Sequence, residues 1–377
     1  MKKFIGIFIA LMLFAGIFSS VSACHFKKNK MQKLEIKTIT PESEVVVSEP
    51  LKDDGDIALL PTMNTKSSAP NRIWVGTFQI VWNEMVDNII KHPVEFVGGT
   101  TQAAKDLNAR EFSKTDISES SYYTTYGIVE PKLKTKIEKA IKEKFNETSD
   151  ILDQFDFSYS PSKILIYAML KKDFKFLEPF EKLADGVFAQ NPNKVKYFGI
   201  SEDSPSKLYQ NVSVLFYNSP SDYAVKLHTK TNDEVILYKT KDDKRFNELF
   251  EDMQAKEAAY NGNKYFGHND RLKVPDLNLY QMTNFPDVEG RPIKDSDFLI
   301  SQTIETVEFK MDNEGVYLKS EAAIMMKLTS VGRPPQIRRF YFDDTFVLFL
   351  IEKDKSVPYF ALRVDDVETL NKTGKKK

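Results

Sequence analysis

Residues 309–327 carry the pattern that decides the fold, and they read Phe309-Lys-Met-Asp-Asn-Glu-Gly-Val-Tyr-Leu-Lys-Ser-Glu-Ala-Ala-Ile-Met-Met-Lys327. Beyond Gly315, every second side chain is apolar or small: Val316, Leu318, Ser320, Ala322, Ile324 and Met326. A period of two is typical of a β-strand that turns one face to a core and the other to water. The segment after Gly315 is therefore predicted to be able to enter a sheet as an extra strand. The alternative is an ordinary strand that occupies the sheet permanently.

Strand-like segments surround this stretch. Runs rich in β-branched and aromatic residues span 164–170, 212–217, 234–239, 306–311, 346–351 and 357–364. They come in groups rather than alternating with helices, which favours an α+β fold with a large mixed or antiparallel central sheet. Polar residues 352–356 separate the last two runs, so we expect a buried C-terminal hairpin.

Three segments have the three-and-four spacing of a helix with one buried face. Their apolar positions are Phe78, Val81, Trp82, Met85 and Ile89; Leu133, Ile137, Ile141 and Phe145; and Phe246, Leu249, Phe250 and Met253. His92-Pro93 is expected to end the first helix, and Pro131 to begin the second. We interpret each face as core packing, with the helices arranged around the sheet.

Several short motifs resemble the serpins, protease inhibitors that trap their target by moving a loop into their own central sheet. Residues 309–315 resemble the strand end and hinge of that family, and residues 321–323 (Glu-Ala-Ala) lie inside the loop. Pro334–Phe340 resembles the Pro-Pro exit from the loop, and residues 346–364 resemble the final hairpin.

Two upstream segments are also similar to serpin segments. In Lys172–Phe180, Phe176 stands where the family has a tryptophan, and Lys273–Leu279 resembles a serpin strand. Residues 72–126 lack the Ser-Pro-x-Ser-Ile-Ser helix start of the family. The resemblance implies a serpin-like fold.

The resemblance also implies roles for the loop. The hinge would comprise Glu314, Gly315, Val316, Leu318, Ser320 and Ala322, and the reactive part Lys327, Leu328, Thr329, Ser330 and Arg333. A serine or cysteine protease would be the partner. The sequence departs from inhibitory serpins in the stretch after Gly315, where small residues are replaced by Val316, Tyr317, Leu318 and Lys319, and such bulk is expected to slow insertion. An inhibitor and a non-inhibitory binding or structural lipoprotein on the same scaffold both remain open.

The N-terminus reads as an export signal. Lys2 and Lys3 precede an apolar run over residues 4–18, which is shorter than the roughly 20 residues of a spanning helix. Val21-Ser-Ala-Cys24 resembles the bacterial lipobox. We therefore expect removal of residues 1–23, lipid on Cys24, and attachment to the outer face of a bacterial membrane or to the cell surface. Cys24 is the only cysteine, so no disulfide can form within the chain.

Composition divides the rest of the chain. Residues 24–70 are polar and contain four prolines, which predicts a tether behind the lipidated cysteine. Residues 71–370 are expected to form one serpin-like domain, and residues 371–377 a basic tail.

Sequence signals for other chemistry are weak. A formal net charge of −1 gives no general attraction for nucleic acid. The four histidines have no helical metal-ligand spacing, no Gly-x-Ser-x-Gly elbow occurs, and Gly98-Gly99 is interpreted as a turn. We expect a monomer that is not an enzyme and has no catalytic residues, metal or cofactor.

Overall fold

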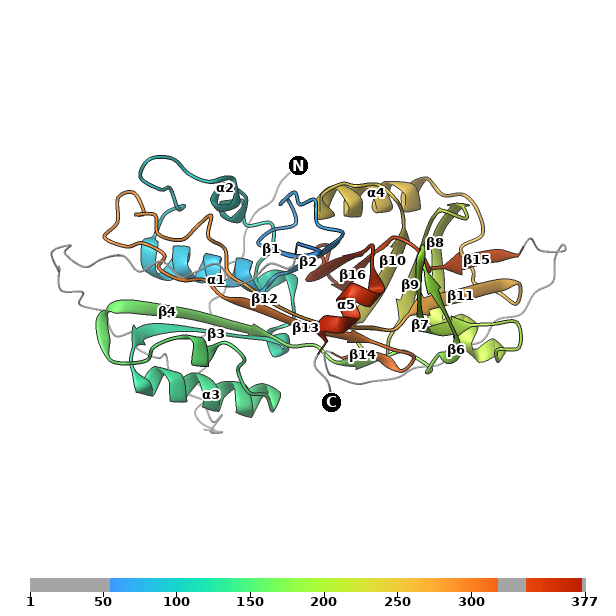
Figure 1. Cartoon of the computed structure of the whole chain (residues 1–377), viewed down its shortest axis with the longest axis horizontal. Helices are drawn as coiled ribbons and strands as arrows, with labels where there is room; N and C mark the ends of the chain where they lie inside the picture. Colours follow the sequence, from blue (N-terminus) through green and yellow to red (C-terminus); the bar gives the residue numbers. More distant parts are fainter. Residues whose placement is uncertain (1–54, 318–336, 375–377) are drawn as a thin grey trace, which may run out of the picture. The chain divides into compact units, whose positions relative to one another are not determined.

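The computed structural model describes residues 55–317 and 337–374, whose strands form several sheets and outnumber the helices (Figure 1). Two of the predicted site regions, around Cys24 and in the loop after Tyr317, lie outside these residues.

The largest sheet has seven strands and contains the C-terminal hairpin. In spatial order they are β1 (Ile57–Leu60), β2 (Asn71–Val75), β17 (Phe360–Val364), β16 (Phe346–Glu352), β10 (Asp233–Lys239), β9 (Asp222–His228) and β8 (Val212–Ser219). Only the β1–β2 pair is parallel. Every residue of β16 is buried, because both faces of this strand are covered. Phe246 and Phe250 of α4 pack on Phe349, and Phe309 stacks on Phe360 with ring centroids 4.8 Å apart.

A four-stranded sheet receives the chain after the loop. Its order is β15 (Arg338–Tyr341), β11 (Asp270–Pro275), β7 (Asn191–Ile200) and β6 (Glu181–Phe188). The strand β15 pairs in parallel with β11, so the residues predicted as the loop exit begin an edge strand of this sheet.

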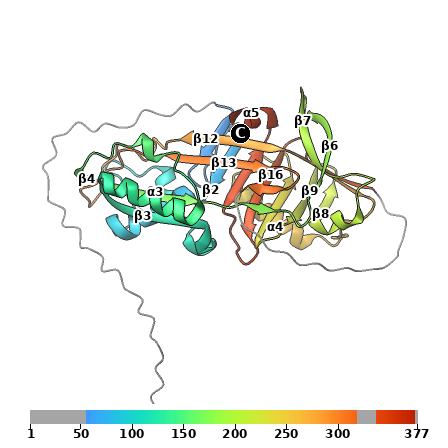
Figure 2. The ribbon, with the colours of Figure 1, turned by 90° about the horizontal axis from the view of Figure 1, so that it is seen from below.

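The central strands form two further groups (Figure 2). One is a four-stranded sheet in the order β12 (Leu277–Thr283), β13 (Glu305–Met311), β14 (Gly315–Tyr317) and β5 (Phe174–Lys175). The other is the antiparallel pair β3 (Tyr122–Val129) and β4 (Ser160–Leu170).

The described residues contain the three predicted helices and two shorter helices that the sequence patterns did not indicate. They are α1 (Thr77–Met85), continued by a π-helical turn over Val86–Ile90, α2 (Gln102–Asn108), α3 (Pro131–Phe145), α4 (Phe246–Ala259) and α5 (Val367–Thr373). Short 3-10 turns span Lys114–Asp116, Glu119–Ser121, Leu152–Gln154 and Ser206–Asn211. Pro131 begins α3, and Lys91, in the left-handed conformation, ends the first helical segment just before His92-Pro93.

Three apolar clusters fill the described residues. The main core lies between the seven-stranded sheet and its neighbours. A second cluster joins α1 and α2 to the segment after β12. The third belongs to α3, β3 and β4, with Leu133, Ile137 and Leu165 among its members. The α+β prediction, with mostly antiparallel sheets and a buried C-terminal hairpin, is confirmed.

Two predicted boundaries need correction. Ile57–Leu60 was assigned to the tether, but it forms β1 and pairs with Asn71–Trp74. Its residues Ile57, Leu59 and Leu60 are buried, which explains why a short apolar run in a polar context belongs to the sheet. The last strand begins at Phe360 rather than at Val357, because residues 353–359 make the connection to β16.

Among the described residues, none of the helices is both long and apolar enough to cross a bilayer.

Candidate functional site

The start of the loop occupies a strand position between two other strands. Gly315 and Val316 of β14 pair with Lys175 and Phe174 of β5, and Val316 and Tyr317 pair with Met311 and Lys310 of β13. Both pairings are antiparallel. β14 is therefore a three-residue central strand rather than a surface loop.

The turn that leads into β14 is fixed by backbone hydrogen bonds. The amide of Asp312 donates to the Gly315 carbonyl at 3.1 Å, and the amide of Phe176 donates to the Glu314 carbonyl at 3.0 Å. The Glu314 carboxylate lies 3.1 Å from the Lys175 ammonium, but both side chains are largely exposed, so this ion pair adds little stability.

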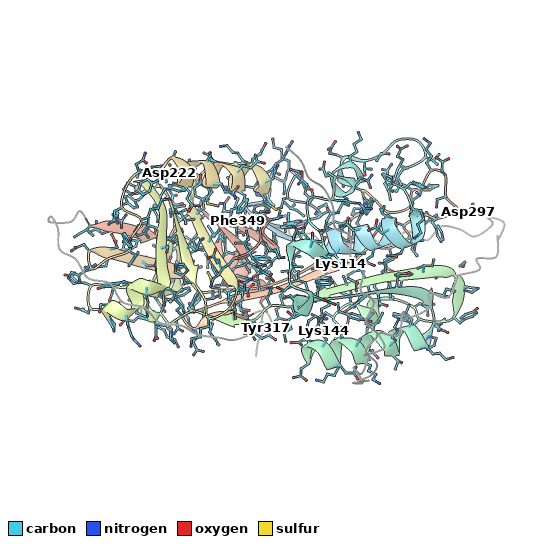
Figure 3. The ribbon with its side chains drawn as sticks, turned by 180° about the vertical axis from the view of Figure 1, so that it is seen from behind. Lys114, Lys144, Asp222, Asp297, Tyr317 and Phe349 are labelled. Carbon is cyan, nitrogen blue, oxygen red and sulfur yellow. The ribbon has the colours of Figure 1, made fainter. Side chains whose placement is uncertain are left out.

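Val316 and Tyr317 point to opposite sides, as the period of two predicts. Val316 is 1% exposed and lies in the main core, whereas Tyr317 is 39% exposed. In Figure 3, Tyr317 lies near Lys144, which belongs to the last turn of α3.

The Tyr317 side chain contacts residues from three segments. Its hydroxyl donates to Oε1 of Glu147 at 2.9 Å. The Lys171 and Lys310 ammonium groups lie 5.5 Å and 5.7 Å from its ring centroid. Burial, and then the hydrogen bond and charge of Glu147, raise the pKa of Tyr317 to about 12.

Beyond β14, one edge of β13 and one edge of β4 form no backbone ladder with another described strand. β13 pairs with β12 along its whole length but with β14 only at Lys310 and Met311. β4 pairs with β3. No ladder joins β13 to β4 within residues 55–317 and 337–374. Because β5 follows β4 in the chain, β14 stands between the ends of β4 and β13, in line with the unpaired edges.

A buried charged cluster holds the segment between β4 and β5. The Lys172 ammonium lies 2.6 Å from the Asp233 carboxylate and also contacts Glu352, while the hydroxyl of Tyr359 donates to Asp233 at 3.0 Å. Burial raises the pKa of Glu352, but the Lys172 ammonium and the Ser118 hydroxyl and amide outweigh it, and the pKa lies below its ordinary value. The cluster ties the strand beside β14 to the seven-stranded sheet.

Glu305, at the start of β13, is another buried carboxyl group. The amide of Phe78, at the start of α1, donates to Oε1 of Glu305 at 3.0 Å, and Oε2 has no hydrogen-bond partner. Burial raises the pKa of Glu305 well above its ordinary value, against the effect of the Phe78 hydrogen bond.

The structure places only part of the predicted site. Of the hinge, Glu314, Gly315 and Val316 are described and adjoin β5 and β13. The other hinge and loop residues lie outside the described residues, as does Cys24: Leu318, Ser320, Ala322, Lys327, Leu328, Thr329, Ser330 and Arg333. In the described part of the chain, no group of His, Cys, Asp or Glu side chains could hold a metal ion.

Sequence reasoning missed the partners of Tyr317. Glu147 and Lys171 are distant in the chain and Lys310 lies just across the turn before β14, and each is a common surface residue type without a motif around it. Only the pairing of β14 with β13 and β5 brings them together. Among the described residues, the last strand before the predicted loop is β14 and the first strand after it is β15, and the two strands belong to different sheets.

No family model and no curated protein match the chain. Solved serpin structures do match. Thyroxine-binding globulin, solved in complex with thyroxine, is 11% identical over 62% of this chain and 64% of its own, with a TM-score of 0.40. Serpin48, described as a highly specific serpin of the insect Tenebrio molitor, is 13% identical over 78% of this chain and 74% of its own, with a TM-score of 0.36.

A third structure is the serpin of Schistosoma mansoni, which is 13% identical over 63% of this chain and 64% of its own, with a TM-score of 0.37. The chain thus spans about 64% of the length of two of these proteins.

Proposed function

We propose that this serpin-like chain is a protease inhibitor, tethered by lipid on Cys24 at an outer bacterial surface. Its loop is cut by a serine or cysteine protease and inserts into the central sheet. The observation that carries the proposal is the position of β14, which already lies between β13 and β5 in line with unpaired edges of β13 and β4.

The polarity of the strands supports insertion along this line. β14 is antiparallel to both neighbours, so its continuation would run antiparallel to β13 from Phe309 back to Glu305. Successive added residues could form ladder hydrogen bonds alternately with the strand on one side and on the other, at about 0.5–1.5 kcal/mol net for each bond. Burial of a large apolar side chain such as Leu318 or Ile324 would contribute roughly 1.5–3 kcal/mol more.

The arrangement of α3, β3 and β4 supports a sheet that can widen. These three elements share an apolar cluster separate from the main core, and β3 pairs only with β4 among the described strands. Movement of this unit as a body would keep its own cluster intact, but it would shift β4 against the other two clusters, where Ala168 belongs to the main core and Ile166 packs on the cluster of α1 and α2.

The protease is trapped if loop insertion is faster than hydrolysis of the bond between the protease and the cut loop. The protease nucleophile attacks a loop carbonyl carbon, an ester or thioester forms, and the new amino terminus leaves. Insertion that outpaces attack by water on this bond leaves the protease covalently attached. Cleavage after Lys327 or Arg333 would suit a trypsin-like enzyme, and cleavage after Met326 or Leu328 would suit other specificities.

The second candidate is a non-inhibitory binding or structural lipoprotein, and the bulk of Leu318 and Lys319, which follow β14, favours it. Side chains of this size lose more freedom on insertion than the small residues of inhibitory serpins. On this scaffold the loop would be cut and the protease released.

One experiment distinguishes the inhibitor from the non-inhibitory lipoprotein. The full chain is incubated with a panel of serine and cysteine proteases and examined on a denaturing gel, with active-site-blocked proteases as controls. An inhibitor gives a complex that survives denaturation and disappears with the blocked enzyme. Cleavage without a complex and without a rise in the unfolding temperature would exclude insertion. A rise without a complex would indicate insertion that is too slow to trap.

A further inference from the structure

Tyr317 lies across the seam at which the central sheet would have to widen. Two ammonium groups lie over its ring: that of Lys310 in β13, 5.7 Å from the centroid, and that of Lys171, directly after β4, 5.5 Å from it. Its hydroxyl reaches Glu147, which follows α3. One side chain thus joins β13 to the α3–β3–β4 unit.

The partners of Tyr317 are themselves held in place. The Lys171 ammonium lies 2.5 Å from Oε1 of Glu147 and donates to the Phe145 carbonyl at 3.2 Å. The Lys171 side chain is only 11% exposed. The Lys310 ammonium lies 2.6 Å from the Glu308 carboxylate. The ring contacts two anchored cations, and its hydroxyl binds a carboxylate that Lys171 also contacts, so the side chain has few alternative positions.

The backbone of Tyr317 is placed as well. It pairs with Lys310, and the preceding Val316 is buried between Met311 and Phe174. Two of the four bulky residues that are expected to slow entry into the sheet, Val316 and Tyr317, are therefore already inside it.

We propose that Tyr317 is a positioning residue, which holds β14 in register so that insertion continues from an existing strand. The inference rests on the proposed function, because it concerns the rate of the same insertion. The first residues of a new strand lose backbone freedom before many hydrogen bonds form, so a strand that is already started removes the slowest step. Removing the ring slows insertion, which reverses the expectation from side-chain bulk.

The test compares Tyr317→Ser and Tyr317→Phe with the wild-type full chain after the loop is cut by a trypsin-like protease and the protease is then inhibited. The measured quantity is the rate at which the unfolding temperature rises. Tyr317→Ser is expected to insert about tenfold more slowly, since several weak contacts are lost together. Tyr317→Phe keeps the ring and restores most of the rate. Tyr265→Ser, which removes a tyrosine that is 79% exposed, matches the wild type.

Equal or faster insertion by Tyr317→Ser would overturn the proposal. Hydrogen exchange on the uncut chain tests the same role without insertion. Protection of the amides of residues 174–176 and 315–317 is expected to fall about tenfold in Tyr317→Ser and to recover in Tyr317→Phe. If no protein gains stability after cutting, the proposed function fails, and exchange alone decides the role of Tyr317. Unchanged protection would then refute it.

Discussion

The backbones of Gly315 and Phe174 lie so close that a Cβ atom at Gly315 would collide with the Phe174 carbonyl oxygen. The same Cβ position lies 2.7 Å from Cα of Lys175. Gly315 does not have a positive φ, so space rather than backbone conformation requires glycine here. The residue that ends the turn is the one that lets β14 approach β5.

Gly315→Ala is expected to displace β14 from β5, because neither backbone can move aside without breaking its ladder. Overpacking of this kind costs roughly 1–3 kcal/mol of the free energy of unfolding. Urea denaturation measures it. Gly267→Ala is the matched control, since nothing lies within 4 Å of the added Cβ there. Equal midpoints for the two variants would refute the close contact.

Lys172→Met tests the charged cluster beside β5. The Lys172 side chain is 7% exposed, and those of Asp233 and Glu352 are 6% and 0% exposed. Removing the cation leaves two buried carboxylates unpaired, which costs roughly 3–5 kcal/mol. The free energy of unfolding of Lys172→Met is compared with that of Lys139→Met, whose partner Glu143 is 3.7 Å away at the surface. The surface variant should change by less than about 0.5 kcal/mol. Similar losses in both would show that the cluster is not stabilising.

The sequence predicted the strands that are buried on both faces and the helices with regular apolar faces. β16 and α3 are examples, because their patterns depend on local burial alone. It did not predict β6, whose exposed residues and Gly186 obscure a strand pattern. Nor did it assign β1 to the sheet, since four apolar residues within a polar stretch resemble a tether as much as an edge strand.

The site was predictable only in part. The alternation after Gly315 gave the buried side of Val316, because the period of a strand is a local property. The contacts of Tyr317 with Glu147 and Lys171 depend on which strands become neighbours in the fold. Glu147 precedes Tyr317 by 170 residues in the chain, and Lys171 precedes it by 146. Surface lysines and glutamates carry no signal for such pairing.

Cys24→Ser tests the proposed anchor. The expected chain is exported but lacks lipid, so it leaves the membrane fraction and appears as a soluble protein. Fractionation and detergent phase partitioning measure the change. Ser22→Thr serves as the control, because it leaves the acylated sulfur intact. If Cys24→Ser remains in the membrane fraction as the wild type does, the lipid anchor is refuted.

Glu305 should make stability depend on pH in a defined direction. Burial raises its pKa in the folded chain above the ordinary value of 4.5. The folded chain therefore binds this proton more tightly than the unfolded chain does. The stabilising contribution of protonated Glu305 to the free energy of unfolding is fully present below pH 4.5 and falls as the pH rises toward the folded pKa. Above the folded pKa this contribution is lost, and the free energy no longer changes with pH through this group.

Glu305→Gln is expected to remove this slope, because an amide stays neutral throughout. The measurement is the free energy of unfolding in urea at intervals between about pH 4 and 8. Glu368→Gln is the contrasting variant. Hydrogen bonds from Asn193, then Lys372 and Asn191, lower the pKa of Glu368 to about 2, so its contribution is present above pH 4.5 and is lost toward acid. If the free energy of unfolding of Glu305→Gln depends on pH as steeply as that of the wild type, Glu305 is ionised in the fold. Its unpartnered oxygen would then need a cation or a water molecule as a partner.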